Sequence, residues 1–208
     1  MKMNLPNKLT IFRMILVPVF VFIAYLQIDG YIIGFSIKYL LLDLIFIIAS
    51  ITDQLDGYIA RKTNQVTTFG KFLDPIADKV LVLSALVMMC EFGLIPGWIP
   101  VIVLAREFIV SGFRLVAVEK GTVIAASIWG KIKTATTMVA IILLLLGGYK
   151  MGAFVNCLMG DEASAMYCMP IGLAIINCIG TVLMVIAVIA TVFSGWDYLK
   201  GGKDLLKN

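Results

Sequence analysis

Four aspartates in the first half of the chain have the type and spacing of a metal-assisted phosphoryl-transfer site. Asp53 and Asp56 are three residues apart and Asp74 and Asp78 are four apart, so each pair shares one face of a helix. Four neighbouring carboxylates would repel one another strongly unless divalent cations neutralised them. Oxygen ligands favour Mg²⁺, Mn²⁺ or Ca²⁺ over zinc or copper, and two such ions stabilise the attacking and leaving oxygens of a phosphoryl substitution.

Small residues and one arginine accompany the aspartates. Gly57, Ala60 and Gly70 would let a phosphorylated ligand approach the backbone closely, and Arg61 offers a forked cation that suits phosphate. Each small residue taken singly is explained equally well by close helix packing in a membrane. That alternative does not explain four acids arranged as two helical pairs.

The composition predicts a membrane protein. Of the 208 residues, 61% are hydrophobic and 14% are charged, and the mean hydropathy is +1.02. A soluble domain of this size cannot bury so much apolar surface, and a disordered chain would be poor in hydrophobic residues. The chain also has no histidine, so chemistry must rest on carboxylates, hydroxyls, lysine or arginine.

The apolar runs predict an all-α fold with six transmembrane helices, at about residues 11–27, 33–52, 72–90, 98–118, 134–149 and within 163–196. Lys and Arg are concentrated in the segments that share a side with the termini, which places both termini in the cytoplasm. In this arrangement Asp53 and Asp56 end the second helix, Asp74 and Asp78 begin the third with Pro75 in its first turn, and all four lie at the inner surface. Residues 1–10 are expected to form a short interfacial segment. Residues 1–208 are expected to form a single domain.

The cysteines give no sign of a metal or redox site. None of Cys90, Cys157, Cys168 and Cys178 has a CxxC partner. Cys157 and Cys168 fall in the predicted outer loop after the fifth helix, where thiols are favoured over a disulfide.

A second cluster is basic. Arg106 and Arg114 are eight residues apart on one face of the predicted fourth helix, and Lys131 and Lys133 open the fifth. Such a cluster beside a pyrophosphate site suggests a second, anionic substrate, with Glu107 available to orient either arginine. The positive-inside rule alone could explain the lysines, but an idle arginine within an apolar helix is costly.

The aspartate region resembles the signature of the CDP-alcohol phosphatidyltransferases. The matching positions are Asp53-x-x-Asp56-Gly57-x-x-Ala60-Arg61, eight further residues, and Gly70-x-x-x-Asp74-x-x-x-Asp78. The resemblance implies a homodimeric six-helix membrane enzyme that transfers a phosphatidyl group from a CDP-linked lipid to an alcohol and releases CMP. It assigns two Mg²⁺ or Mn²⁺ ions to the four aspartates and the role of base to Asp78. It also assigns contacts with CDP-diacylglycerol to Asp56, Gly57, Ala60, Arg61 and Gly70.

Further blocks resemble the bacterial members of that family that use sn-glycerol 3-phosphate. They are residues 106–114 and 123–134, together with a less specific N-terminal motif, residues 4–13, whose Asn7 is a weaker candidate for binding CDP-diacylglycerol. The last helix and the loop before it add nothing to the match. The resemblance implies that Arg106, Arg114, Lys131 and Lys133 hold the acceptor phosphate. It implies an active site facing the cytoplasm, in a multi-pass protein of the bacterial cytoplasmic membrane, with no nucleic-acid partner.

Three alternatives stay open from the sequence. The first is the same chemistry with inositol phosphate, serine or phosphatidylglycerol as acceptor. The second is a small cation transporter, which would favour acids near the bilayer midplane, where only Asp43 is expected. A buried structural pair, with Lys38 nearby, is the default interpretation of Asp43. The third is a scaffold protein, against which the metal-like cluster argues.

Overall fold

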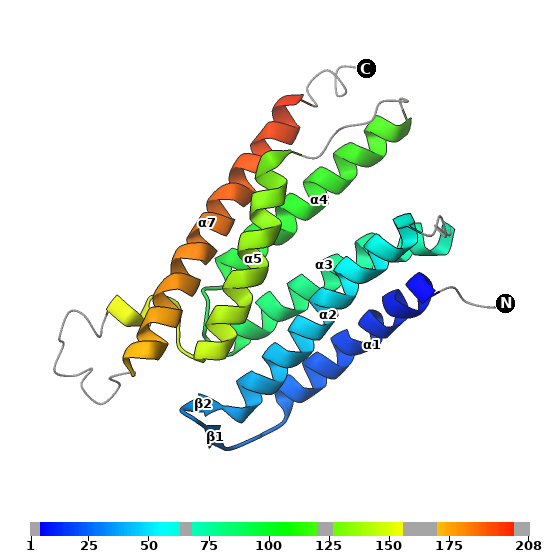
Figure 1. Ribbon diagram of the computed structural model, residues 1–208. Helices are drawn as coiled ribbons and strands as arrows, with labels where there is room; N and C mark the ends of the chain where they lie inside the picture. The colour runs from blue at the N-terminus through cyan, green and yellow to red at the C-terminus, as the bar shows by residue number, and fades with distance from the viewer. Residues whose placement is uncertain (1–4, 63–67, 120–126, 156–169, 202–208) are drawn as a thin grey trace. The chain divides into compact units, whose positions relative to one another are not determined.

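The computed structural model describes residues 5–62, 68–119, 127–155 and 170–201, and this part of the chain is almost entirely helical. Its six long helices are α1 (Leu5–Tyr25), α2 (Ile37–Lys62), α3 (Thr68–Glu91), α4 (Trp98–Glu119), α5 (Ile128–Gly147) and α7 (Ile171–Gly201). A small antiparallel hairpin of β1 (Tyr31–Ile32) and β2 (Phe35–Ser36) connects α1 to α2 (Figure 1). The predicted helical class is confirmed, and the hairpin is an addition to it.

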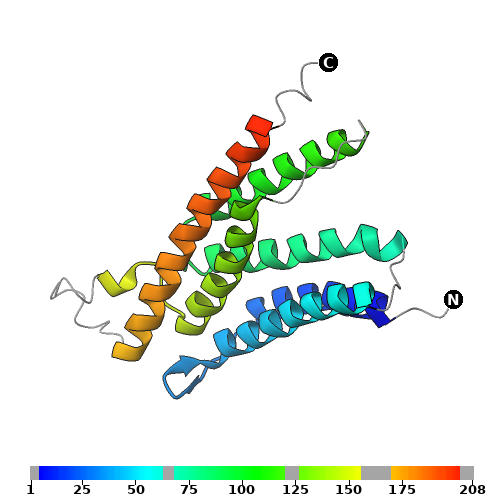
Figure 2. The ribbon, with the colours of Figure 1, turned by 45° about the horizontal axis from the view of Figure 1, so that its top comes forward.

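The chain divides into two compact units. The first comprises Met1–Phe92 with Leu145–Gly148, and the second comprises Gly93–Leu144 with Tyr149–Asn208. In the first unit α1 packs against both α2 and α3, which also contact each other, and Figure 2 shows α1 running beside α2. In the second unit α4 packs against α7. The single domain expected from the sequence stays a prediction.

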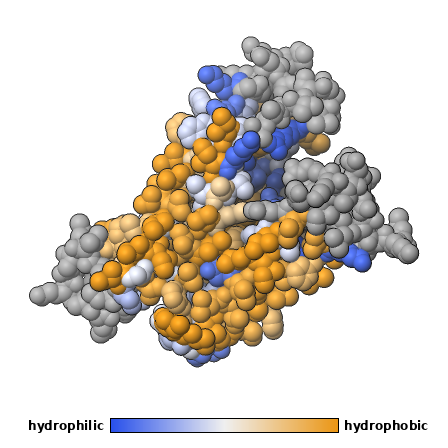
Figure 3. All heavy atoms as spheres, viewed as in Figure 1, coloured by the Kyte–Doolittle hydropathy of each residue, from blue (hydrophilic) through white to orange (hydrophobic). Residues whose placement is uncertain are grey.

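Within the described residues, three helices are long and apolar enough to cross a membrane: Lys8–Tyr25 in α1, Ile128–Gly147 in α5 and Ile171–Lys200 in α7. Hydrophobic side chains also cover much of the face shown in Figure 3. Because such helices need a lipid environment, the chain is a membrane protein. The helices α2, α3 and α4 carry the charged residues of the predicted site, which lowers their apolar content. Six spans and cytoplasmic termini remain predictions.

The connection between α1 and α2 differs from the prediction. The second helix begins at Ile37, four residues later than expected, because the preceding residues form the hairpin. Its two-residue loop consists of Ile33, with a φ of 54°, and Gly34, with a φ of 85°. Positive φ at both positions is typical of a type I′ turn, whose twist matches that of the paired strands.

The N-terminal segment is also different. Over its described part it is not a separate surface segment, because α1 runs without interruption from Leu5 to Tyr25. Pro6 is the second residue of this helix, where the missing N–H costs no intrahelical hydrogen bond. The expectation of an independent segment over residues 1–10 is therefore wrong from Leu5 onward.

The aspartates lie inside their helices and not at the ends. Helix α2 continues to Lys62, nine residues beyond Asp53, because no proline interrupts it there. Helix α3 begins at Thr68, so Pro75 lies in its interior and not in its first turn. A proline at an interior position leaves the carbonyl four residues earlier without its intrahelical donor.

Polar side chains of α7 anchor the segment that follows α5. The buried Asn177 amide donates to the carbonyls of Tyr149 and Lys150, at 3.3 and 3.1 Å, and accepts from the Phe154 N–H. These bonds satisfy backbone groups that would be costly to bury alone. Cys157 and Cys168, whose pairing the sequence leaves open, lie outside the described residues.

Candidate active site

The two aspartate pairs lie on neighbouring helices of the first unit. Asp53 and Asp56 are in α2, Asp74 and Asp78 are in α3, and these helices contact each other. The helical backbone confirms that each pair shares one helix face. The side chains of Asp53 and Asp78 are partly exposed, and those of the other two are outside the description. Among the described side chains no group of three potential metal ligands occurs, so a metal site in this region stays a prediction.

A buried arginine joins this cluster from α1. The Arg13 side chain is fully buried and forms an ion pair through Nη1 with Oδ1 of Asp53, which is 27% exposed. An arginine within an apolar helix is retained only when an anion compensates it, because desolvating an unpaired guanidinium is expensive. Arg13 therefore belongs to the acidic cluster. The signal was present in the sequence as a single charge in an apolar run, but it did not identify the partner.

The remaining residues that are predicted to contact CDP-diacylglycerol are placed only by their backbone. Gly57, Ala60 and Arg61 follow the first aspartate pair along α2, and Gly70 precedes the second pair in α3. Asn7 lies in the first turns of α1. Their side chains lie outside the description, so their contacts with a nucleotide stay predictions.

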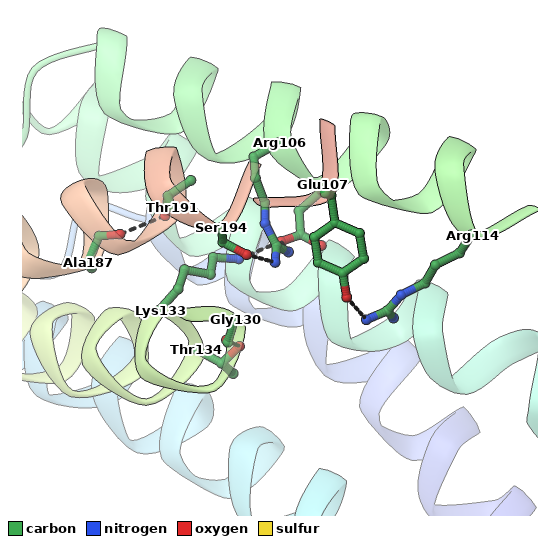
Figure 4. Close-up of polar contacts among 10 residues, drawn as sticks. Arg106, Glu107, Arg114, Gly130, Lys133, Thr134, Ala187, Thr191 and Ser194 are labelled. Atoms are coloured by element: carbon green, nitrogen blue, oxygen red, sulfur yellow. Dashed lines mark hydrogen bonds and ion pairs between the residues drawn. The ribbon is translucent and has the colours of Figure 1, made fainter. Parts of the chain in front are cut away.

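Glu107 is the centre of the basic cluster, which belongs to the second unit. Its Oε1 accepts a hydrogen bond from Arg106 Nη1 at 2.9 Å and another from Lys133 Nζ at 2.5 Å. Arg106 also donates through Nη2 to the hydroxyl of Ser194 in α7 at 2.5 Å. Figure 4 shows the Arg106 and Lys133 side chains converging on Glu107 from α4 and α5. The expected orienting role of Glu107 is thus supported by its contact with Arg106.

All three charged side chains of this group are largely buried. The exposed fractions are 11% for Arg106, 20% for Glu107 and 8% for Lys133. A Cβ at position 130 would lie 3.2 Å from Arg106 Nη2, so Gly130 leaves room for the guanidinium. One donor of the group is unsatisfied, since the buried Nε of Arg106 has no hydrogen-bond partner among the described residues.

Arg114 extends the cluster towards the C-terminal part of α7. Its Nη2 donates to the hydroxyl of Tyr198 at 2.7 Å, and its guanidinium carbon lies 5.5 Å from the centroid of the same ring. The guanidinium carbon of Arg106 lies 5.9 Å from that centroid. Both arginines of the predicted face are therefore placed against one aromatic side chain.

Lys131 does not join this group. Its side chain is exposed, and its ammonium has no ion-pair partner in the part of the chain that the structure describes. Both lysines lie in the first two turns of α5, which Ser127 caps by accepting the Trp129 N–H at 3.2 Å. Residues 131 and 133 then point about 200° apart around the helix axis.

The sequence interpretation overlooked Ser194 and Tyr198. Both come from α7, the helix that contributed nothing to the family resemblance, and both are buried. A serine and a tyrosine near the end of an apolar helix were a weak signal, because tyrosine is common at membrane interfaces and serine is common between packed helices. Their contacts with Arg106 and Arg114 follow only from the packing of α7 against α4.

The expected pairing of Asp43 is also wrong. It is 4% exposed, and its Oδ1 has no hydrogen-bond partner within the described ranges. The expected pair with Lys38 is not formed, because residues five apart lie on different helix faces. The Lys38 ammonium instead lies 4.9 Å from the centroid of the Phe92 ring.

The apolar helices define a helical membrane protein, and it carries paired aspartates and a buried basic cluster. A sequence model of the CDP-alcohol phosphatidyltransferases matches residues 3–196, and the chain belongs to this family.

Three relatives are similar over much of their length, and each carries the name CDP-diacylglycerol–glycerol-3-phosphate 3-phosphatidyltransferase. The protein of Bacillus subtilis is 39% identical over 209 residues, which cover 98% of this chain and 97% of the relative. That of Haemophilus influenzae is 47% identical over 146 residues, covering 68% and 75%. That of Rickettsia typhi is 36% identical over 200 residues, covering 96% and 97%.

Proposed function

We propose that the protein transfers the phosphatidyl group of CDP-diacylglycerol to sn-glycerol 3-phosphate and releases CMP, a reaction of phospholipid biosynthesis. The names of the three relatives state both substrates, and two of these relatives match almost the whole chain. The paired aspartates supply the metal-binding chemistry that the donor requires, and the basic cluster supplies a site for a second anion.

The observation that carries the acceptor assignment is the basic cluster around Glu107. Three cations, Arg106, Arg114 and Lys133, accompany one acid, so the group has a net charge of +2. A phosphate monoester carries a charge of about −1.5 to −2 at neutral pH. The buried Arg106 Nε–H, which has no acceptor among the residues that the structure describes, is a donor that an anion would satisfy. Serine has no net charge and would leave the charge of the cluster uncompensated. Inositol phosphate and phosphatidylglycerol are anionic, and the names of the relatives favour glycerol 3-phosphate over them.

The assignment of CDP-diacylglycerol as the phosphatidyl donor depends on the acidic cluster of four aspartates in α2 and α3. Carboxylate oxygens are the ligands that Mg²⁺ and Mn²⁺ prefer, and the described members Asp53 and Asp78 are both accessible from outside the protein. The residues therefore fit two divalent cations, which Asp53, Asp56, Asp74 and Asp78 would hold. When bound, such ions neutralise charge on a pyrophosphate. Arg61 and the small residues Gly57, Ala60 and Gly70 would contact the cytidine diphosphate.

The chemical step follows from these roles. Asp78 accepts the proton of the C1 hydroxyl of glycerol 3-phosphate. The resulting oxygen attacks the lipid-linked phosphorus, a new phosphorus–oxygen bond forms, and the bond to the CMP oxygen breaks. Arg106, Arg114 and Lys133 hold the acceptor phosphate during the attack, and Lys131 contributes from the exposed face of α5. The products are phosphatidylglycerophosphate and CMP.

The cellular setting belongs to the same proposal. Six spans with both termini in the cytoplasm would place the acids at the inner surface, where glycerol 3-phosphate and CMP are soluble. The bacterial source of the relatives fits the cytoplasmic membrane as the location. A homodimer, as the family resemblance implies, completes the assembly that we propose.

A CMP-release assay on the purified protein tests the proposal. The reactions contain CDP-diacylglycerol in mixed micelles, Mg²⁺ or Mn²⁺, and one acceptor from a panel of glycerol 3-phosphate, inositol phosphate, serine, phosphatidylglycerol and glycerol. We expect release with glycerol 3-phosphate and its loss in EDTA. Release with another acceptor of the panel and none with glycerol 3-phosphate would contradict the acceptor assignment.

A further inference from the structure

Tyr198 lies where the two arginines of the basic cluster meet. It comes from α7, whereas both arginines come from α4, and only 4% of its surface is exposed. The guanidinium carbons of Arg106 and Arg114 lie 5.9 and 5.5 Å from its ring centroid. One side chain therefore contacts both ends of the cationic face.

The two arginines depend on this tyrosine to different degrees. Arg106 has two other hydrogen-bond partners, Glu107 and Ser194. The only hydrogen bond of the Arg114 side chain within the described residues is the 2.7 Å bond to the Tyr198 hydroxyl. Because Arg114 is exposed, losing this bond would free a long side chain that has many rotamers.

The aromatic ring also offsets a repulsion. Two guanidinium groups on one helix face repel each other, and the negative face of an aromatic ring attracts each of them. The phenolic oxygen adds a hydrogen bond that fixes the direction of Arg114. A pair of cations held in this way is preorganised for a phosphate, so less conformational entropy is lost when the anion binds.

We propose that Tyr198 is a positioning residue for the acceptor phosphate. Its hydroxyl holds Arg114, and its ring holds both arginines. The inference rests on the proposed function, because the phosphate that the arginines meet is that of glycerol 3-phosphate. It assigns the end of α7 a part in acceptor specificity that the family resemblance does not include.

The test is a kinetic comparison of Tyr198→Phe, Arg114→Gln and the double variant with the unaltered full-length protein. Tyr198→Phe keeps the ring and its packing and removes only the hydroxyl. We expect it to raise the KM for glycerol 3-phosphate about fivefold, the value of one ordinary hydrogen bond, and to leave the KM for CDP-diacylglycerol unchanged. In the Arg114→Gln background the same change should have no further effect, because the hydroxyl acts through Arg114.

Tyr25→Phe is the matched control, since it removes the same hydroxyl from a side chain that is 65% exposed at the end of α1. A purely structural role of Tyr198 would alter both KM values together, or would add to the effect of Arg114→Gln, and either result would overturn the inference. An unchanged KM for glycerol 3-phosphate in Tyr198→Phe would overturn it as well. The proposed function fails separately, if the unaltered protein does not use glycerol 3-phosphate.

Discussion

Replacing Arg106 with glutamine is the most informative perturbation of the basic cluster. The change removes the hydrogen bond to Glu107 at 2.9 Å, the bond to Ser194 at 2.5 Å and the contact with the Tyr198 ring. It also lowers the net charge of the group from +2 to +1, because Glu107 and two cations remain. Lys133 still donates to Glu107 at 2.5 Å, so the carboxylate stays compensated and the variant should fold.

The expected magnitude follows from the burial of the side chain. Arg106 is only 11% exposed, so a hydrogen bond from it to a phosphate oxygen would be weakly screened. A hydrogen bond to a charged group contributes about 1.5–3 kcal/mol. Losing one such bond should raise the KM for glycerol 3-phosphate about 10- to 150-fold. The KM for CDP-diacylglycerol should not change, since CDP-diacylglycerol is proposed to bind at the aspartates of α2 and α3.

The assay follows CMP release in mixed micelles while glycerol 3-phosphate is varied at a saturating concentration of CDP-diacylglycerol. Arg106→Lys serves as the control for charge, because it keeps the cation and loses the fork, and we expect an intermediate KM. Circular dichroism and gel filtration verify folding. An unchanged KM for glycerol 3-phosphate in a folded Arg106→Gln variant would refute the assignment of this cluster to the acceptor.

Four further substitutions test the other parts of the site. Arg13→Gln should lower the free energy of unfolding by about 2–4 kcal/mol, measured by denaturant titration in micelles, because it removes a buried ion pair with Asp53. A change below about 0.5 kcal/mol would show that the pair is not stabilising. Asp78→Asn should abolish CMP release and leave the circular dichroism spectrum unchanged, whereas full activity would exclude Asp78 as the base. Lys133→Gln should raise the KM for glycerol 3-phosphate about tenfold, and Lys131→Gln should raise it less than about threefold. The reason is that Lys133 lies in the buried group and Lys131 does not. Equal effects of the two substitutions would contradict this distinction.

Much of the fold follows from the sequence because the helices are long and apolar. The fourth helix begins at Trp98 as expected, and the third ends within one residue of its predicted end at Cys90. The hairpin between α1 and α2 was missed because Ile33 has a β-branched side chain that disfavours positive φ. The extent of α2 was underestimated because its charged residues were taken as the end of an apolar run, although Ala60, Arg61 and Lys62 favour a helix.

The site was predictable to the extent that spacing along one helix determines it. The pair of Asp53 and Asp56 and the face shared by Arg106 and Arg114 could be derived from helical periodicity alone. Contacts between helices could not be derived in this way. The pairing of Arg13 with Asp53, and that of Arg114 with Tyr198, depends on which helices pack together and in which register.

In the proposed reaction the acceptor oxygen attacks the lipid-linked phosphorus, and an isotope measurement tests this directly. The substrate is glycerol 3-phosphate with ¹⁸O in the C1 hydroxyl, and the products are analysed by mass spectrometry. We expect the label in phosphatidylglycerophosphate and none in CMP. Label in a cytidine-linked glycerol phosphate, with phosphatidic acid as the other product, would show attack at the wrong phosphorus and contradict the account.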